Sequence, residues 1–395
     1  MNRSPSSPSY LQPTRNPRLS HLRCISCSLI LPLADHPRGC PACEAAARPS
    51  SLEAVYSELP SSIRPSPSGF HWGEWLPYLE GVSLGEGSTP CLELPRLARE
   101  LGIARLSVKH EGMNPTGSHK DRMSAQAVSR ALEAGAETVV LASSGNAAVS
   151  AAAYCAAAGL RCEVATYRNM PQAFVTALQR LGAQRIAFDR GAQRWEHVRR
   201  RVEDDGAFAL TNYCLPPVGS PVFGVEGYRA VALECAAEGC VPDHVLVPTA
   251  RGDLLWGVYS GFRDLHAAGL IDRMPRLWAV EPFPRLTKVL EGEPAQREFS
   301  GETAQFSIAG GTVTLQQVLA VRNSGGGAVV VDDIGAHRGA SSLAREGYWV
   351  ELCAGSGVTA TAQLLADHSF AASDHVLLVL TAKGDRDPFD PAAIS

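Results

Sequence analysis

The sequence lacks any long hydrophobic run and any strong excess of charge of either sign. No apolar run approaches the roughly 20 residues that a bilayer requires. The formal net charge of −4 gives no overall attraction to nucleic acid or to anionic lipid. The N-terminus also has no apolar core of an export signal. These absences favour a cytoplasmic protein that binds neither nucleic acid nor a membrane.

The composition is otherwise that of a globular protein. Of its 395 residues, 45% are hydrophobic and 19% are charged, and this length suffices for two or three packed units. Residues 1–20 are rich in Ser, Pro and Arg, and their prolines oppose an amphipathic helix. We therefore expect residues 1–22 to be a disordered tail.

The 11 cysteines favour free thiols or a metal site over a disulfide framework, because their number is odd and the chain is long. Cys24 and Cys27 form one CxxC pair, and Cys40 and Cys43 form another after a gap of twelve residues. Each pair can place two thiolates on one ion, so together they predict a structural zinc ribbon at residues 23–46. Unligated thiols or a decayed metal site are the alternative.

From residue 94 onward, helical and strand patterns alternate. Such repetition predicts parallel strands in open sheets with helices on both faces, the α/β class. Residues 46–83 are expected to be a linker with poorly periodic segments, and Pro and Gly cluster at 212–221. Strands are expected at 106–108, 138–142, 162–166, 185–188, 244–248, 277–281, 328–331 and 376–381. Helices are expected at 94–101, 146–158, 171–181, 193–203, 224–237, 253–266, 336–346 and 357–366.

One lysine lies at a junction between a loop and a helix. Turn residues at 114–117 precede Lys120, and apolar residues then recur at helical spacing from Asp121 until Gly135. An amine held rigidly at such a junction can react covalently with a carbonyl compound. A solvated lysine at the start of a helix is the alternative interpretation.

Three polar loops follow predicted strands, and ligands of open α/β sheets bind beyond the C-terminal ends of the strands. Loop 143–146 (SSGN) offers hydroxyl and N–H groups to a carboxylate, although these residues also suit a plain helix cap. Loop 249–253 (TARGD) suits a phosphate, because it combines N–H groups, a hydroxyl and an arginine. Loop 381–384 (TAKG) follows the last strand.

A reactive lysine, a carboxylate cradle and a phosphate loop suit one kind of chemistry when they occur together. An aldehyde cofactor that carries a phosphate and acts on an amino acid needs all three. Pyridoxal 5'-phosphate fits this description, with Lys120 as its Schiff-base partner.

Several segments carry a resemblance to a known family. The segments KHEGMNPTGSHKDR and ASSGNAAVSAAAYCAAAG resemble the lysine and asparagine motifs of fold type II pyridoxal-phosphate enzymes, and most closely those of threonine synthases. GEGSTPCLELPRLARELG, the EG of FGVEGYRAVALE, and LTAKGDRD resemble further landmarks in the same order, and the CxxC pairs resemble an N-terminal zinc ribbon. The resemblance covers roughly residues 24–390.

The resemblance implies a role for individual residues. Lys120 would hold the cofactor and shuttle protons, Asn146 would bond its 3-hydroxyl, and Thr381 would lie by its pyridine nitrogen. A neutral hydroxyl at Thr381 leaves that nitrogen largely unprotonated, which favours elimination and replacement over transamination. The substrate carboxylate would be bound by Ser143, Ser144, Gly145 and Ala147. The cofactor phosphate would be bound by Thr249, Ala250, Arg251, Gly252 and Asp253.

The sequence departs from the family pattern in three places. TARGD replaces a glycine-rich phosphate loop and keeps only Gly252. Asp253 would repel a phosphate unless it turns away, and Arg251 would compensate. His119 stands where phenylalanine is common, as in tryptophan synthase β-chains, and suggests a contact with the cofactor phosphate or a proton relay. Ala382 replaces a glycine.

The resemblance also implies a domain plan. The expected architecture is two open parallel-sheet domains with helices on both faces, of the tryptophan synthase β-like fold type II, plus the zinc ribbon. Residues 47–122 and 215–395 would form the large cofactor-binding domain, with residues 123–214 as a small inserted α/β domain. Family members are often homodimers.

The function that this implies is a pyridoxal-phosphate-dependent lyase or synthase that acts on an amino acid by elimination or replacement. The favoured reaction converts O-phosphohomoserine to threonine and phosphate. It requires a second anion pocket, for which Lys109, Thr116 and Arg122 are candidates. The alternatives are a β-eliminating ammonia-lyase or β-replacement synthase on serine- or threonine-like substrates, and a cofactor-less pseudoenzyme that acts as a binding module.

Overall fold

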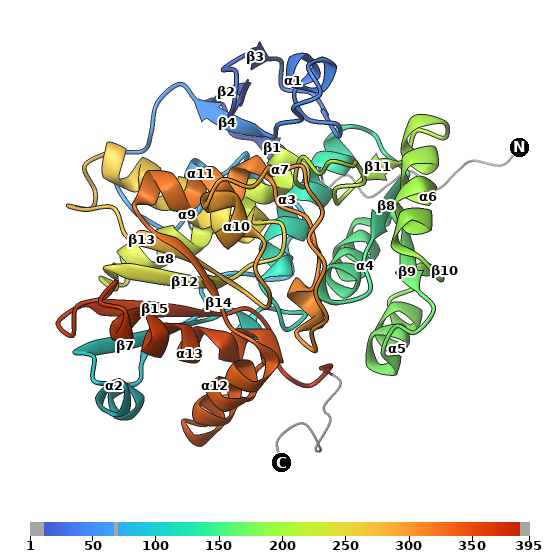
Figure 1. Ribbon diagram of the computed structural model, residues 1–395. Coiled ribbons are helices and arrows are strands. Elements are labelled where there is room, and N and C mark those ends of the chain that lie inside the picture. Colours follow the sequence, from blue (N-terminus) through green and yellow to red (C-terminus); the bar gives the residue numbers. More distant parts are fainter. Residues whose placement is uncertain (1–11, 67–69, 388–395) are drawn as a thin grey trace, which may run out of the picture.

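The computed structural model describes residues 12–66 and 70–387. Two open sheets, each with its own helices, stand side by side, and a small three-stranded sheet lies across one end of the molecule (Figure 1). The predicted α/β class with two parallel-sheet units is confirmed. None of the helices in the described ranges combines the length and the apolar character needed to cross a membrane.

The larger sheet has six strands in the order β14-β13-β12-β15-β7-β6, parallel except for β6. Its strands are β6 (Cys91–Glu93), β7 (Arg105–His110), β12 (His244–Pro248), β13 (Arg276–Glu281), β14 (Gly327–Val330) and β15 (His375–Leu380). Its helices are α2 (Pro95–Leu101), α7 (Val222–Val225), α8 (Arg229–Ala237), α9 (Asp253–Ala267), α10 (Leu286–Leu290), α11 (Leu315–Ser324), α12 (Asp333–Arg345) and α13 (Leu352–Ala366).

Both faces of the larger sheet are buried, as its continuous apolar strands require. Successive side chains point to opposite faces, so Val245 and Val247 of β12 enter one core cluster while Leu246 between them enters the other. Helices α9 and α11 cover one face, and α12 and α13 cover the other (Figure 1). The carboxyl ends of all five parallel strands therefore lie along one edge of this sheet.

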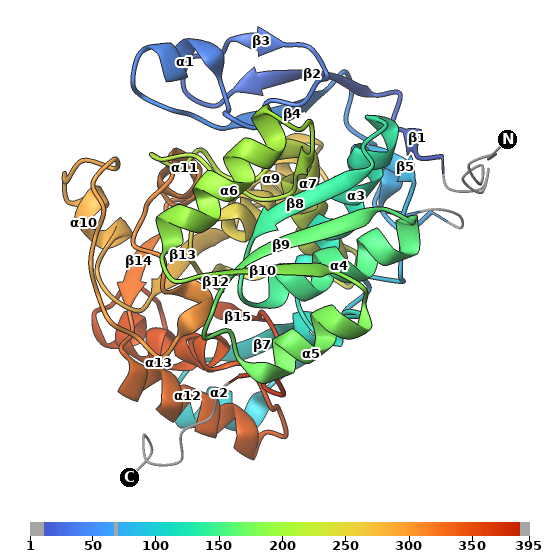
Figure 2. The same cartoon turned by 90° about the vertical axis from the view of Figure 1, so that its right-hand side faces the viewer.

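The smaller sheet has four parallel strands in the order β10-β9-β8-β11. Its strands are β8 (Thr138–Ala142), β9 (Arg161–Tyr167), β10 (Gln184–Phe188) and β11 (Phe208–Ala209), with helices α4 (Asn146–Ala158), α5 (Gln172–Arg180) and α6 (Gly191–Glu203). Helix α3 (Lys120–Glu133) packs on α4 and joins the two sheets (Figure 2). Its chain turns away at Gly135, whose φ of +71° suits glycine.

The N-terminal region differs from the sequence-based expectation. Residues 1–11 of the predicted tail lie outside the described residues, but residues 12–22 are ordered and enter β1 (Thr14–Arg15) and β2 (Leu19–Cys24). β2 pairs with β3 (Ile30–Leu31) and with β4 (Leu52–Tyr56), which lies in the predicted linker, and β1 pairs with β5 (Tyr78–Glu80). Order arises because β2 and β4 bury Leu22, Leu52 and Ala54 against the body of the protein.

A close contact between helix α3 and the turn before α8 fixes the path of the chain into α8. Gly227 lies in a short 3-10 turn (Glu226–Tyr228) packed on α3, and a Cβ at this position would come within 2.0 Å of the carbonyl oxygen of Arg122. Only glycine fits there without moving the turn away from α3. The EG pair singled out in the sequence thus has a packing reason.

Gly227→Ala is expected to lower the free energy of unfolding by about 1–3 kcal/mol, because the turn and α3 must separate to admit a methyl group. Chemical denaturation measures this change. Gly357→Ala is the matched control: its Cβ would have no neighbour closer than 3.4 Å in helix α13, so this variant should be neutral or more stable. Equal stabilities of the two variants would contradict the packing argument.

Candidate active site

Lys120 is the first residue of α3 and is half-buried. The preceding loop is fastened to the loop that follows β15: the His119 N–H donates to the Thr381 carbonyl at 2.9 Å, and the Lys383 N–H donates to the Gly117 carbonyl at 3.0 Å. The Lys120 ammonium donates to the Tyr228 hydroxyl at 3.3 Å. Burial lowers the pKa of Lys120 from its ordinary value, and nearby Asp253 opposes this while Arg251 reinforces it. The structure therefore holds this amine rigidly and eases its deprotonation.

A buried network of charges lies directly behind the lysine loop. Arg122 donates to Glu111 at 2.7 and 2.8 Å and to Glu234 at 2.6 and 2.7 Å, and Lys109 pairs with Glu234 at 2.8 Å. Each of these side chains is at most 2% exposed. Burial alone would raise the pKa of Glu234, but Arg122 and Lys109 lower it to about 2, so it stays ionised. Two buried cations are thus balanced by two buried carboxylates.

This network corrects one prediction. Lys109 and Arg122 were candidates for a second anion pocket, but both are committed to glutamates inside the protein. Thr116, the third candidate, bonds Asp121 through its hydroxyl and its N–H. Basic residues beside a reactive lysine look alike in a sequence whether they face a ligand or an internal carboxylate. The three residues therefore stabilise the loop.

The predicted carboxylate cradle follows β8 at the carboxyl edge of the smaller sheet. Ser143 accepts from the Gly145 N–H at 3.3 Å, and Ser144 accepts from the Tyr167 N–H at 2.8 Å. Among the described residues, nothing accepts from the N–H groups of Asn146 and Ala147 at the start of α4. These two groups are free to bind an anion at the positive end of the helix.

The predicted phosphate loop follows β12 at the carboxyl edge of the larger sheet. Within the described part of the chain, the N–H groups of Ala250, Arg251 and Gly252 have no acceptor. Gly252 has a φ of +81°, which lets the loop turn into α9. The buried Nε of Arg251 also lacks a hydrogen-bond partner. The loop offers several unused donors to an anion, as a phosphate site requires.

Asp253 does not obstruct this loop. Its carboxylate accepts from the Ser220 N–H at 3.1 Å, from the Ser220 hydroxyl at 2.7 Å and from the Gln316 amide at 2.5 Å. The side chain is therefore turned toward Ser220 and toward Gln316 of α11, and away from the free N–H groups. TARGD can serve where a glycine-rich run is usual, because its acidic residue is held elsewhere.

Between the two edges lies a buried carboxylate that the sequence did not reveal. Glu351 accepts from the Asn146 amide at 3.3 and 3.4 Å and from the Ser307 hydroxyl. Burial raises the pKa of Glu351 to about 7; Ser307 and Lys120 oppose the rise. The Cys353 thiol lies between Glu351 and Thr381: its sulfur is 3.5 Å from a carboxylate oxygen of Glu351 and 3.7 Å from the Thr381 hydroxyl oxygen. The predicted residues Asn146 and Thr381 are thus linked through this glutamate.

Three other residues at the site were not singled out from the sequence, although Tyr228 and Arg386 lie in segments that carry the family resemblance. Tyr228 meets Lys120 from the turn before α8, and its ring lies 5.5 Å from that of His119. Arg386 donates to the Asn146 side-chain oxygen at 3.3 Å. Arg194 of α6 donates to the Ser144 hydroxyl at 3.4 Å. Each comes from a segment distant in sequence, so only the folded chain brings it to the site.

The four cysteines predicted as metal ligands also come together. Their sulfur atoms all lie within 4.8 Å of one another, with Cys24 and Cys43 at 3.6 Å and Cys27 and Cys40 at 3.6 Å. Elsewhere Cys91 and Cys240 form a disulfide, which the expectation of free thiols did not include. The CxxC cluster lies in the N-terminal unit, away from Lys120.

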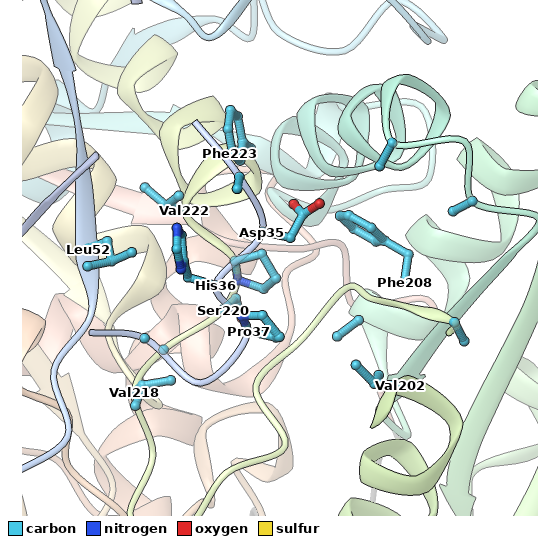
Figure 3. A pocket seen from close by; sticks show the side chains of 18 of the residues that line it. Asp35, His36, Pro37, Leu52, Val202, Phe208, Val218, Ser220, Val222 and Phe223 are labelled. Atoms are coloured by element: carbon cyan, nitrogen blue, oxygen red, sulfur yellow. The ribbon is translucent and has the colours of Figure 1, made fainter. Parts of the chain in front are cut away.

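A cavity of about 280 Å³ lies where the N-terminal unit meets both larger units (Figure 3). Asp35, Phe208 and Phe223 are among its lining residues. The Asp35 carboxylate is already paired with Arg130 at 2.9 Å through both oxygens. None of the predicted site residues lines this cavity, so it is separate from the lysine site.

The comparisons with known proteins agree with this geometry. The profile described as "Pyridoxal-phosphate dependent enzyme" matches residues 82–382, a range that contains Lys120, loops 143–146 and 249–253, and Thr381. The chain belongs to the pyridoxal-phosphate-dependent enzyme family. Residues of this structure fit the cofactor: an accessible lysine of lowered pKa, a loop of unused N–H donors, and the side chains of Asn146 and Thr381 nearby.

Within this family the chain is similar to threonine synthases. It is 30% identical to the threonine synthase of Methanosarcina acetivorans over 398 residues, which cover 93% of this chain and 92% of the relative. It is 31% identical to that of Methanocaldococcus jannaschii over 333 residues, 80% of each chain. The prediction of a pyridoxal-phosphate-dependent lyase or synthase is confirmed.

Several solved structures share the fold of this chain. Maize serine racemase superposes with a TM-score of 0.65 at 20% identity, covering 78% of this chain and 90% of that one. Threonine deaminase isoform 2 from Solanum lycopersicum gives 0.63 at 17% identity, covering 78% and 85%. At these identities the similarity establishes the architecture only.

The raised pKa of Glu351 predicts a pH-dependent loss of stability in the cofactor-free protein. Its carboxyl is protonated more readily in the folded than in the unfolded chain, so stability falls as pH rises from about 4.5 to about 7 and then levels off. Glu351→Gln should remove this loss, amounting to at most about 3 kcal/mol at pH 8.

Urea denaturation at pH 5 and pH 8 measures this difference. The control is Glu302→Gln, which removes an exposed glutamate without altering the pH dependence. A Glu351→Gln variant with the same pH dependence as the unaltered protein would disprove the assignment.

Proposed function

We propose that the protein is a threonine synthase, which converts O-phosphohomoserine to threonine and phosphate. Threonine synthases at 30% and 31% identity over most of the chain support this substrate. The observation that carries the proposal is the position of Lys120 between a carboxylate cradle and a phosphate loop, at the meeting edges of two sheets. This arrangement accommodates an amino-acid substrate and a phosphate-bearing cofactor together.

Each group of the cofactor has a residue in this chain to hold it. Lys120 would bind the aldehyde, the N–H groups of loop 249–253 would bind the phosphate, Asn146 would bond the 3-hydroxyl, and Thr381 would lie by the pyridine nitrogen. When bound, pyridoxal phosphate delocalises the negative charge that develops at the substrate Cα. His119, which donates its Nδ1–H to the Thr381 carbonyl at 3.0 Å, fixes the loop that carries Lys120.

The substrate is held by the other sheet. Ser143, Ser144, Gly145 and Ala147 would bind its carboxylate through hydroxyl and N–H groups at the start of α4. Lys120 would be the base that takes the proton from the substrate Cα, because burial favours its neutral form. Tyr228, at 3.3 Å from the Lys120 nitrogen, orients that amine. In the net reaction the Cγ–O bond breaks to release phosphate, Cγ gains a proton to become the methyl group, and Cβ exchanges one proton for the hydroxyl of water.

The cysteine cluster is proposed to hold one structural zinc ion. Zinc–thiolate bonds of about 2.3 Å place tetrahedral ligand sulfurs about 3.8 Å apart, close to the 3.6 Å of the two nearest pairs. All four positions are protein ligands, so the ion would stabilise the N-terminal unit without a direct part in catalysis. A cytoplasmic location and a homodimer stay predictions.

Lys120→Ala is expected to abolish the visible absorption band of the purified protein and to reduce phosphate release from O-phosphohomoserine by at least about 1,000-fold. Lys288→Ala, a lysine on α10 outside the site, is the control and should retain both. Keto-acid formation from serine or threonine without phosphate release from O-phosphohomoserine would identify an ammonia-lyase and contradict the proposed substrate.

Cys27→Ser together with Cys40→Ser is expected to lower bound zinc from about one ion per chain to near zero, because two of four thiolates are lost. Elemental analysis of the purified protein measures the metal. Cys214→Ser, which alters a thiol outside the cluster, should leave the zinc content unchanged. Metal-free unaltered protein after zinc-supplemented expression would rule out the zinc site.

A further inference from the structure

One buried arginine differs from all the others in the described part of the chain. Five arginines are buried there, and four of them hold a carboxylate at N···O distances between 2.6 and 3.3 Å. Arg194, on α6 of the smaller unit, is 9% exposed, and among the described residues it has no ion pair. Its Nε has no hydrogen-bond partner there either. A buried guanidinium without a counter-ion is costly and requires an explanation.

A second arginine in the same electrostatic situation approaches Arg194 from the larger unit. Arg251 belongs to the phosphate loop after β12, is half-buried, and likewise has an unpartnered Nε and, within the described ranges, no ion pair. Burial lowers the pKa of Arg251, Asp253 opposes this, and Arg194 lowers it further. Arg194 therefore disfavours the charged form of Arg251.

Aromatic rings hold both cations in place. The Arg194 guanidinium carbon lies 3.5 Å from the centre of the Tyr167 ring, and that of Arg251 lies 4.9 Å from the centre of the Trp195 ring. Trp195 follows Arg194 on α6, so one helix supports both arginines. Cation–π contact orients a guanidinium but leaves its charge uncompensated. The pair is preorganised to receive an anion.

Arg194 also borders the place where the substrate would bind. It donates to Ser144, a residue of the proposed carboxylate cradle, while Arg251 borders the proposed cofactor phosphate. A group bound between the two arginines would thus lie beside the substrate carboxylate and beyond the cofactor. Two planar guanidinium groups match the charge and the oxygen geometry of a phosphate monoester dianion.

We propose that Arg194 and Arg251 form a phosphate subsite that binds the γ-phosphate of the substrate and so selects phosphorylated amino acids. This inference rests on the proposed function, since it names the residues that provide the second anion pocket. The bound dianion neutralises both arginines and links α6 of the smaller unit to the loop after β12 of the larger one.

The test uses the cofactor-loaded enzyme. Its first measurement is a calorimetric titration with inorganic phosphate as the probe. Arg194→Gln is expected to raise the dissociation constant of inorganic phosphate by at least about tenfold, as loss of one charge-assisted hydrogen-bond partner predicts. Arg200→Gln is the matched control, because it removes an exposed arginine from the same helix. It should change phosphate binding by less than about twofold.

Steady-state kinetics provide the second measurement. Arg194→Gln should raise KM for O-phosphohomoserine by at least about tenfold, and should change KM for the uncharged ester O-acetylhomoserine by less than about twofold. Equal effects on both compounds would indicate a structural role for Arg194 and overturn the proposal.

Titration of the cofactor-free variant with pyridoxal phosphate distinguishes a subsite for the substrate phosphate from one for the cofactor phosphate. An unchanged cofactor dissociation constant in Arg194→Gln supports binding of the substrate phosphate. A cofactor constant raised by the same factor as that of inorganic phosphate would mean that both arginines serve the cofactor, which overturns the proposal.

The proposed function and this inference fail in different ways. Absence of a visible band on adding pyridoxal phosphate to the unaltered protein would defeat the proposed function. The inorganic phosphate titration does not depend on catalysis, so it still decides whether Arg194 binds a phosphate. Unaltered protein that shows no phosphate binding would overturn the subsite.

Discussion

The buried contact of Arg122 with Glu111 and Glu234 is the constraint on which the site depends. It joins the end of β7, the first turn of α3 and helix α8, and Lys109 completes its charge balance. Breaking such a buried pair costs about 3–5 kcal/mol, because one charge is left without a partner. The lysine loop lies between these elements and cannot shift while the contact holds. A reactive amine is thus positioned by charges that never meet the ligand.

Around that fixed lysine, the two sheets contribute different kinds of binding. The smaller sheet presents N–H groups at the start of α4, and the larger sheet presents the unused donors of loop 249–253. Two buried arginines near the site differ in whether a carboxylate balances their charge. Arg122 is neutralised internally and stabilises the fold, whereas Arg194 is buried without a counter-ion and is preorganised for a ligand. The contrast between these arginines distinguishes structural from functional charge in this chain.

Much of the fold could be predicted from the sequence, because strands such as 138–142, 244–248 and 376–381 are continuous apolar runs between polar loops. The lysine and asparagine loops could also be found, since their motifs are local. Glu351, Tyr228 and Arg194 could not, because each matters only through contacts with distant segments. The prediction for Lys109 failed for a related reason: a sequence does not show whether a cation faces a ligand or a buried carboxylate. Strand β4 was missed because its residues, LEAVY, do not alternate between apolar and polar and so resemble the poorly periodic segment around them.

We propose that Lys120 is the residue that binds the aldehyde of pyridoxal phosphate. Borohydride reduction of the cofactor-loaded protein, followed by proteolysis and mass spectrometry, tests it most directly. We expect one cofactor to become covalently attached to the peptide that contains Lys120. Attachment at Lys109, Lys288 or Lys383 instead, or no attachment at all, would contradict it.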